Sequence, residues 1–376
     1  MSASRPGSTH RAVAVAIAAT ASIAGASVLS PAAIAHSQPA HVTSFSTGLV
    51  AHTILHGADL GLTQPDDLTH LGDHLFVAFQ NGVPSTGGST GTPTQSTVVE
   101  LTLAGTVLKR WQLTGKCDGL TADPAHHRLI ATVNEDGNSS LDTIGTGKDG
   151  IVTHYTYDAN PLPHGGGTDS ITVDQGRIFV AASAPAAGTF GPAIYQVTLS
   201  DGVAHLTAAP FYDSSSAIVA NTGGGQATVN LALTDPDSGG VVPAVSPRFA
   251  GQLMLTSQGD QQQVYASHPG TDAQVLRVLN LSQSVDDTAW ATAPTGILVT
   301  TDSTNDTVVV ISGRFSLGRA YAAVTPANAN SAPPNPGPNY LGTINLATGS
   351  VSAVPTSGDL VQPKGLLFLP AGDATR

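Results

Sequence analysis

Aspartate recurs at a regular interval along this chain, each time just before a short apolar segment. Asp67, Asp118 and Asp169 are spaced by 51 residues each (118 − 67 and 169 − 118), and Asp287 stands in the same local context further along. Carboxylate oxygens are the ligands that Ca²⁺ prefers in proteins. If the fold brings these four side chains together, they form a calcium site. The alternative is that each aspartate caps its own turn by accepting backbone N–H groups, and the spacing is compatible with both.

A second set of polar residues follows apolar segments instead of preceding them. In a sheet of antiparallel strands, the residues that precede one strand and those that follow its neighbour share an edge. We therefore expect this second set to lie on the same face as the aspartates and to bind a ligand there: Asn81, Asn134, Glu135, Asp136 and Asp302.

Catalytic motifs are scarce. The chain has no Gly-x-Ser-x-Gly, His-Glu-x-x-His or Walker motif, and Gly145–Gly150, which matches Gly-x-Gly-x-x-Gly, is followed by no helix that would hold a pyrophosphate. His164 precedes Gly165-Gly166-Gly167 and Asp169, so a His164–Asp169 pair is a weak candidate for a general base. The alternative is a solvated histidine in a turn.

The elements that position these residues are predicted to be strands, because short β-branched and aromatic runs alternate with Gly, Asp, Asn and Pro. Strand pairs recur with a period near 50, with a weaker copy over Val241–Leu255 and a last half-copy over Pro363–Phe368. Four strands per unit at this period are typical of a β-propeller blade. We expect one all-β propeller of six blades, within a range of five to seven, closed by pairing a strand within His41–Leu55 with the final strand. A β-sandwich, or two of them, would not explain the aspartate spacing.

The repeat units resemble six-bladed propellers of the NHL, TolB-like and gluconolactonase-type superfamily. Each full unit has a Pro- or Asp-led turn, a Gly-Leu or Gly-Ile strand, an Asp-Pro turn and a second apolar strand, and the likeness covers most of residues 60–370. These motifs are generic, so the resemblance implies a fold and leaves the activity open. It does not match the ligand pattern of the gluconolactonases position by position.

The composition and the N-terminal segment limit the cellular compartment and the class of partner that we expect. Of 376 residues only 11% are charged, the formal net charge is −12, and 24 of the 26 acids are Asp, so a helical protein or a nucleic-acid binder is not expected. Basic residues, an apolar run over residues 12–29 and Ala33-Ile34-Ala35 predict a Sec-type signal peptide over residues 1–35. The propeller domain is then 36–376, a secreted protein without a membrane span in its mature chain. Cys117, the single cysteine, is expected to be buried and inert.

Two functions follow from these features. The first is an exported propeller that binds a small molecule, a glycan or a protein on its acidic, loop-decorated face. The alternative is a lactonase or esterase of the gluconolactonase type, in which a divalent cation polarises the carbonyl. A quinoprotein dehydrogenase is remote, because only 5% of the residues are aromatic.

Overall fold

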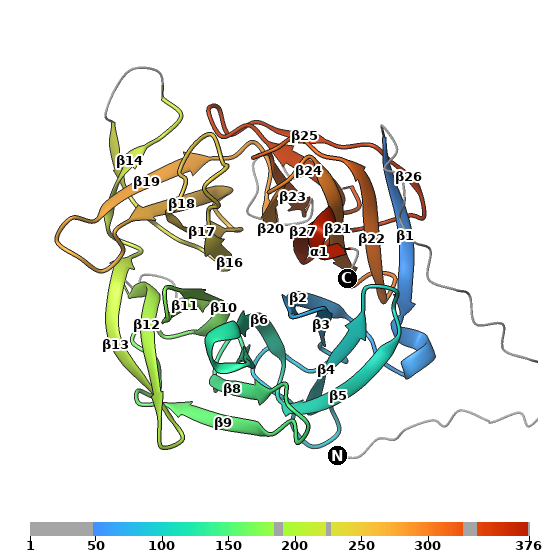
Figure 1. The fold of residues 1–376 in the computed structure, drawn as a ribbon. Coiled ribbons are helices and arrows are strands. Elements are labelled where there is room, and N and C mark those ends of the chain that lie inside the picture. The colour runs from blue at the N-terminus through green and yellow to red at the C-terminus, as the bar shows by residue number, and fades with distance from the viewer. Residues whose placement is uncertain (1–47, 184–190, 223–226, 326–336, 375–376) are drawn as a thin grey trace, which may run out of the picture. The chain divides into compact units, whose positions relative to one another are not determined.

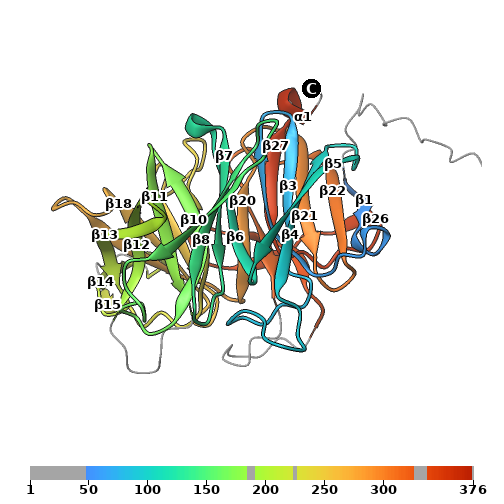
Figure 2. The ribbon, with the colours of Figure 1, turned by 90° about the horizontal axis from the view of Figure 1, so that it is seen from below.

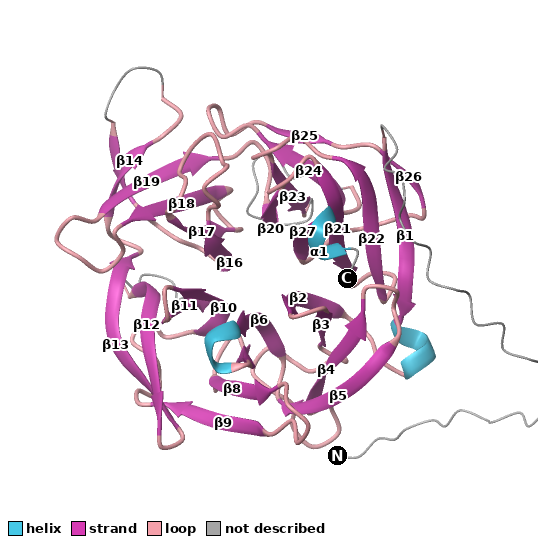
Figure 3. Ribbon diagram, viewed as in Figure 1, coloured by secondary structure: helices cyan, strands magenta, loops and turns pink. Residues whose placement is uncertain are grey.

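The computed structural model describes residues 48–183, 191–222, 227–325 and 337–374. The predicted signal peptide, residues 1–35, lies outside these ranges. Within them the chain is all-β, as expected, and its one α-helix is the four-residue α1 (Ala371–Ala374) (Figure 3). Gly57–Leu60 and Pro124–His126 form short 3-10 helices. None of the described helices has the length and apolar character to cross a bilayer.

The first half of the described chain forms four-stranded antiparallel units whose strands follow sequence order. The first unit consists of β2 (Pro65–Leu71), β3 (His74–Phe79), β4 (Gln95–Thr102) and β5 (Val107–Thr114). The second consists of β6 (Cys117–Asp123), β7 (Arg128–Val133), β8 (Ser140–Gly145) and β9 (Val152–Tyr157). The third consists of β10 (Gly167–Asp174), β11 (Arg177–Ser183), β12 (Pro192–Ser200) and β13 (Val203–Tyr212). A short parallel pairing of β13 with β9 joins the second and third units into one eight-stranded sheet.

The fourth unit carries an extra hairpin on its outer strand. Its own strands are β16 (Pro236–Val241), β17 (Leu253–Ser257), β18 (Gln262–Ser267) and β19 (Val275–Asn280). The hairpin of β14 (Ser216–Val219) and β15 (Thr228–Asn230) pairs with β19 through β14. The sequence prediction placed the first strand of this unit too late, at Val241, because the strand contains Gly239 and Gly240 and so looks like a loop.

The last two units exchange strands in chain order. One sheet holds β20 (Val285–Trp290), β23 (Ala320–Val324), β24 (Tyr340–Ile344) and β25 (Val351–Ala353). The other holds β26 (Thr356–Gly358), β1 (Leu49–His56), β22 (Thr307–Arg314), β21 (Thr295–Asp302) and β27 (Leu366–Pro370). The hairpin β21–β22 thus lies between β20 and β23 in sequence but belongs to the neighbouring sheet. The strand that contains Asp287, β20, therefore pairs with β23 and not with β21, the next strand in the sequence.

The N-terminal and final strands share a sheet without pairing directly. β1 pairs with β22 and, in parallel, with β26, whereas β27 pairs with β21. The predicted direct pair between the first and last strands is therefore not formed. A direct pair is not needed, because the β21–β22 hairpin connects β1 to β27 within the sheet.

The units stand around a common centre in a propeller-like arrangement (Figure 1). The innermost strand is the first of its unit, except in the last sheet, where it is β27; the view turned by 90° shows the strands running side by side between two opposite faces (Figure 2). Inner strands such as β3 are buried on both sides, whereas the outer strand β5 alternates between buried and exposed residues. This difference is what radial packing of sheets requires, since outer strands meet solvent.

Apolar side chains fill the spaces between neighbouring units. Phe76 and Trp111 of the first unit pack with Leu129 of the second, and Phe179 of the third packs with Leu253 of the fourth. A further cluster joins Val299 and Val308 of the β21–β22 hairpin to residues of β3, including Val77 and Phe79. The core of this part of the chain is therefore a series of inter-sheet layers.

Candidate functional site

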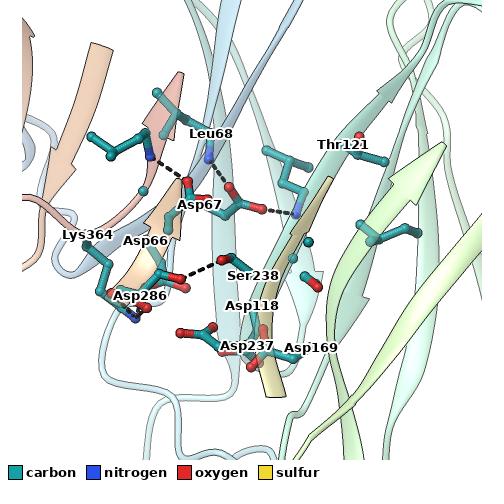
Figure 4. Close-up of a pocket in the computed structure, with 18 of the residues that line it drawn as sticks. Asp66, Asp67, Leu68, Asp118, Thr121, Asp169, Asp237, Ser238, Asp286 and Lys364 are labelled. Carbon is teal, nitrogen blue, oxygen red and sulfur yellow. Dashed lines mark hydrogen bonds and ion pairs between the residues drawn. The ribbon is translucent and has the colours of Figure 1, made fainter. Parts of the chain in front are cut away.

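Six equivalent residues begin the innermost segments and converge on one cavity. They precede the buried part of β2, β6, β10, β16, β20 and β27, and we call them the inner set: Asp66, Asp118, Asp169, Asp237, Asp286 and Lys364. Five carboxylates and one ammonium group thus occupy the same structural position (Figure 4).

A β-bulge directs the inner set toward the centre. In β2, β6, β10, β16 and β20 the pairing with the neighbouring strand slips by one residue at this position. In β2, Pro65 pairs with Phe79 and Leu68 with Val77, so that Asp66 and Asp67 both oppose a single residue. A bulge of this kind re-aims side chains, which explains why two consecutive residues of each strand border the cavity.

The bulges also bring adjacent first strands close together. A Cβ atom added to Gly119, which follows Asp118, would lie 2.6 Å from the carbonyl oxygen of Asp169. Only glycine allows this approach without displacing the backbone of β10. Thr132 of β7 donates a hydrogen bond to the same carbonyl, which fixes the position of Asp169 relative to the second unit.

The cavity has a volume of ≈ 210 Å³ and an acidic lining. Seven aspartates and one lysine border it: Asp66, Asp67, Asp118, Asp169, Asp237, Asp286, Asp287 and Lys364. All four aspartates predicted as metal ligands, Asp67, Asp118, Asp169 and Asp287, are among them. Like charges at this density repel unless protons or cations compensate them.

Two lysine ammonium groups supply part of this compensation. Lys364 Nζ lies 3.0 and 2.9 Å from the two carboxylate oxygens of Asp286 and 3.3 Å from Asp66 Oδ1. Lys116 Nζ lies 2.9 Å from Asp118 Oδ1 and also contacts Glu135. The surrounding carboxylates raise the pKa of Lys116 and, well above its usual value, that of Lys364, although burial acts in the opposite direction. Both lysines are therefore charged at neutral pH.

Asp66 Oδ1 lies 3.3 Å from Lys364 Nζ but accepts no hydrogen bond from a described residue, and two more carboxyl groups also lack a full set of partners. Asp118 is 4% exposed; its Oδ1 accepts hydrogen bonds from Gln80 and Lys116, but its Oδ2 is buried without a partner among the described residues. The Asp169 carboxyl group receives no hydrogen bond from them. Burial, followed by the nearby Glu135, raises the pKa of both groups well above the ordinary value. Burying either carboxyl group with so few hydrogen-bond partners costs free energy, whether the group is ionised or protonated.

Asp237 and Asp286 form a carboxyl pair in the same cavity. Burial and the neighbouring Asp286 raise the pKa of Asp237 well above its ordinary value. Burial also acts on Asp286, but Lys364 and a hydrogen bond from Asp237 outweigh it and lower the pKa of Asp286. Gln258 Nε2 donates to both groups, at 3.0 and 3.1 Å. The two shifts have opposite directions because the groups interact closely, so their protons are released as those of a pair.

Asp67 and Asp287 occupy the second position of their bulges and bind backbone. Asp67 accepts from the amides of Leu68 at 2.7 Å and Leu120 at 2.6 Å, and thereby joins β2 to β6. Asp287 accepts from Thr288 at 2.6 Å and from Leu366 at 2.7 Å, joining β20 to β27. Burial raises the pKa of Asp287 to about 6. Asp67 and Asp287 thus accept backbone N–H groups, as the turn-capping alternative predicts. Each also accepts an amide of the next sheet and so joins two sheets.

Two of the expected ligand-binding residues lie outside the cavity and form hydrogen bonds with neighbouring parts of the chain. Asn81 Oδ1 accepts from the Thr63 amide at 3.2 Å, and its Nδ2 donates to Thr97 Oγ1 at 3.0 Å. Asp302, which is fully buried, accepts from the amides of Thr304 and Gln362 at 3.0 and 2.7 Å. Neither borders the acidic cavity.

The other three lie on one turn with different roles. Asn134 accepts from the Lys116 amide at 2.9 Å and borders a second cavity. Glu135 contacts Lys116 and so belongs to the electrostatic surroundings of Asp118. Asp136 is exposed, and its amide donates to the Ser85 carbonyl at 3.1 Å. Glu135 thus lies beside Asp118 and Asn134 borders the second cavity, while ligand binding by these residues stays a prediction.

The expected His164–Asp169 pair is not formed. His164 is fully buried; its Nδ1 bonds with the Tyr195 hydroxyl and its Nε2 donates to the Gly167 carbonyl at 2.6 Å. Burial lowers its pKa, so the imidazole is neutral. Cys117 is buried as expected, and burial raises the pKa of its thiol.

The sequence analysis missed three residues of the inner set: Asp66, Asp237 and Asp286. Equal spacings of 51 residues favoured Asp67 over Asp66, whereas the structural spacing is 52 (118 − 66) and then 51 (169 − 118). The signal that identifies Asp237 is the dipeptide Pro236-Asp237, which matches Pro65-Asp66 and, with a change of charge, Pro363-Lys364.

No set of three or more acidic, histidine or cysteine side chains among the described residues is placed to hold one metal ion. Ca²⁺ takes six to eight oxygen ligands at about 2.3–2.6 Å. Asp67, Asp287, Asp286 and one oxygen of Asp118 already have hydrogen-bond donors. The calcium site stays a prediction.

No protein-family model matches the chain, and no curated protein matches it. Among solved structures, it is similar to the periplasmic gluconolactonase of Pseudomonas aeruginosa, with a TM-score of 0.45 and 15% identity over 81% of this chain and 88% of that one. A protein from Lactobacillus plantarum gives a TM-score of 0.44 and 13% identity, over 82% and 89%. Hydrazine synthase of Kuenenia stuttgartiensis gives 0.39 and 14%, over 76% and 67%. These similarities do not identify an activity for this chain.

Proposed function

We propose that this protein is an exported, six-bladed propeller, closed into a single ring, that binds an organic cation carrying ammonium groups in its central acidic cavity. The observation that carries the proposal is the unpartnered Asp118 Oδ2, buried in a cavity bordered by seven aspartates and one lysine.

Contacts between the last and first sheets support the closed ring. Thr301 of β21 donates to the Asp66 carbonyl, and Ser303 donates to that of Pro65. A Cβ atom on Gly365, just before β27, would lie 2.5 Å from the Asp66 carbonyl oxygen. With the six members of the inner set at equivalent positions, these contacts support six blades.

The two lysines support an ammonium-bearing ligand over a metal ion. Lys116 and Lys364 show that ammonium groups fit between these carboxylates at 2.9–3.0 Å. A ligand amine placed beside Asp118 and Asp169 would meet the same chemistry, with charge-assisted hydrogen bonds. A volume of ≈ 210 Å³ is also larger than a bare ion needs, and suits a small diamine.

Calorimetric titration of the purified protein with 1,4-diaminobutane tests this proposal. We expect saturable binding that weakens at high salt, because ion pairs are screened. Asp118→Asn should abolish most of it, whereas Asp149→Asn, which removes the same charge from an exposed loop residue, should leave it unchanged.

Two outcomes would contradict the amine proposal. One is absence of heat with the diamine; the other is equal binding by Asp118→Asn and the wild type. Titration with Ca²⁺ provides the comparison. Tight calcium binding that blocks the diamine would favour the metal site, and with it the lactonase alternative, which a chelator-sensitive lactone assay would then examine.

A further inference from the structure

A second cavity, of ≈ 420 Å³, lies apart from the acidic one. The loops that follow β3, β7 and β9 border it, together with the ends of β5 and β9. Its volume falls in the range of small-molecule sites, about 300–1,000 Å³. The turn Asn134–Glu135 separates the two cavities: Asn134 borders this one, while Glu135 contacts Lys116 beside Asp118.

The described residues that border it are mostly polar, and none of them is an Asp, Glu, Lys or Arg. Hydroxyl and amide groups dominate it, and His154 is its one imidazole. The side-chain hydroxyls of Thr114, Ser140 and Thr156 bond with no other residue of the described chain. These groups are available as donors and acceptors for a ligand.

His154 is held in a defined orientation. Its Nδ1 lies 2.9 Å from Oδ1 of Asp142, which is buried beneath it at 2% exposed. In the tautomer whose Nδ1–H donates to Asp142, Nε2 is left as a hydrogen-bond acceptor. The His154 side chain is 54% exposed, so Nε2 can meet a ligand in the adjoining cavity.

The walls of the cavity are fixed before a ligand arrives. Asn134 uses both ends of its amide, accepting from the Lys116 amide and donating to the Asn138 carbonyl at 3.0 Å. A Cβ atom on Gly87 would lie 3.1 Å from Asn134 Nδ2, so the loop after β3 packs closely on this side chain. Tyr157, Pro161 and Leu162 add apolar surface.

We propose that this second cavity binds a neutral, polyhydroxylated ligand, a sugar, and that His154 Nε2 accepts a hydrogen bond from one of its hydroxyl groups. A charged ligand would lose its hydration without gaining a counter-ion, because the lining offers none. A sugar matches the free hydroxyls with its own and places its C–H faces against Tyr157 and Leu162.

Three sugars with the same ring test the proposal: D-glucose, D-glucosamine and D-glucuronate, each titrated into the protein while the His154 ring signals are followed by NMR. Glucose should shift them. His154→Ala should weaken glucose binding by about fivefold or more, the equivalent of one hydrogen bond of about 1 kcal/mol. The matched control is His126→Ala, since His126 pairs with the buried Asp123 at 2.7 Å but does not border the cavity.

Thr114→Val, which leaves Asp142 paired, keeps the test valid if His154→Ala fails to fold, and should also weaken glucose binding. Asp118→Asn should leave it unchanged, which separates this site from the acidic cavity. No shift with glucose, tighter binding of glucuronate than of glucose, or equal losses in the two histidine variants would overturn the proposal.

Discussion

Asp169 sits among acidic neighbours without a hydrogen-bond donor of its own. Burial, Glu135 and Asp118 raise its pKa, and its position is fixed through its carbonyl rather than its carboxyl group. A side chain kept in such surroundings lowers stability, and natural proteins accept this cost at functional sites. This is the residue-scale argument for a binding role.

We expect Asp169→Asn to stabilise the ligand-free protein by about 1 kcal/mol, the usual size of a gain from relieving charge repulsion, and to weaken diamine binding. Urea unfolding and calorimetry measure the two effects. A loss of stability with unchanged binding would show that the Asp169 charge is structural.

The pH dependence has a definite sign. A carboxyl group whose pKa is raised on folding contributes stability at low pH and loses it as the pH rises through the folded-state pKa. Asp118, Asp169 and Asp237 all belong to this class; Asp286, with its lowered pKa, acts oppositely. The free energy of unfolding should therefore fall as the pH rises above the ordinary carboxyl pKa of about 4, less steeply in Asp169→Asn. A flat profile in the wild type would contradict this.

Lys364→Met should reduce the free energy of unfolding by about 2 kcal/mol, below the usual 3–5 for a fully buried pair, because a third of the lysine side chain is exposed. Adding Asp286→Asn should recover part of the loss, since the carboxylate nearest to Lys364 is then removed; recovery is only partial because Asp66 still lacks its lysine. Diamine binding by Lys364→Met should tighten. A double variant no more stable than the single one would argue against the pair.

At the scale of elements, the β-bulges determine which side chains of the inner strands border the cavity. Each bulge places two consecutive residues on the cavity side, one for the cavity and one for the neighbouring sheet. In β2 these are Asp66 and Asp67, and in β20 Asp286 and Asp287. The two aspartates of each doublet therefore have different duties.

Asp67→Ala should cost about 1–3 kcal/mol, because it leaves the amides of Leu68 and Leu120 without their acceptor. Hydrogen exchange of the Leu120 amide should accelerate, while that of Leu129, within the β7 ladder, should stay slow. Unchanged exchange at Leu120 would show that this clasp does not hold β2 and β6 together.

At the scale of the whole molecule, the strand β1 ties the N-terminal side of the described chain to its end. It places Leu49 and Ala51 in one inter-sheet cluster and Leu55 in the next. Removing residues 1–47 should leave the melting temperature unchanged, whereas removing residues 1–56 should abolish cooperative unfolding. Equal melting curves for the two truncations would contradict a closing role for β1.

Export makes a prediction about the N-terminus. If residues 1–35 are a signal peptide, the protein recovered from outside the producing cell begins at His36, as intact-mass measurement would show. Recovery of the uncleaved chain only inside the cell would contradict it.

The sequence by itself determined the all-β class, the repeat and the acidic character of the centre. Strand propensity and turn residues are local, and a recurring Asp before a strand is visible without coordinates. It also placed Asp118 and Asp169 on one face.

Only the tertiary structure decided which aspartate of each doublet faces the cavity and that the β21–β22 hairpin joins the sheet of β1. A bulge changes the facing of a residue by a one-residue slip, and the pairing of β20 with β23 depends on packing between segments far apart in sequence. Neither the bulge nor the long-range pairing leaves a local signature in the sequence. The recurrence of aspartates before the strands was therefore predictable, whereas the partners of each carboxyl group were not.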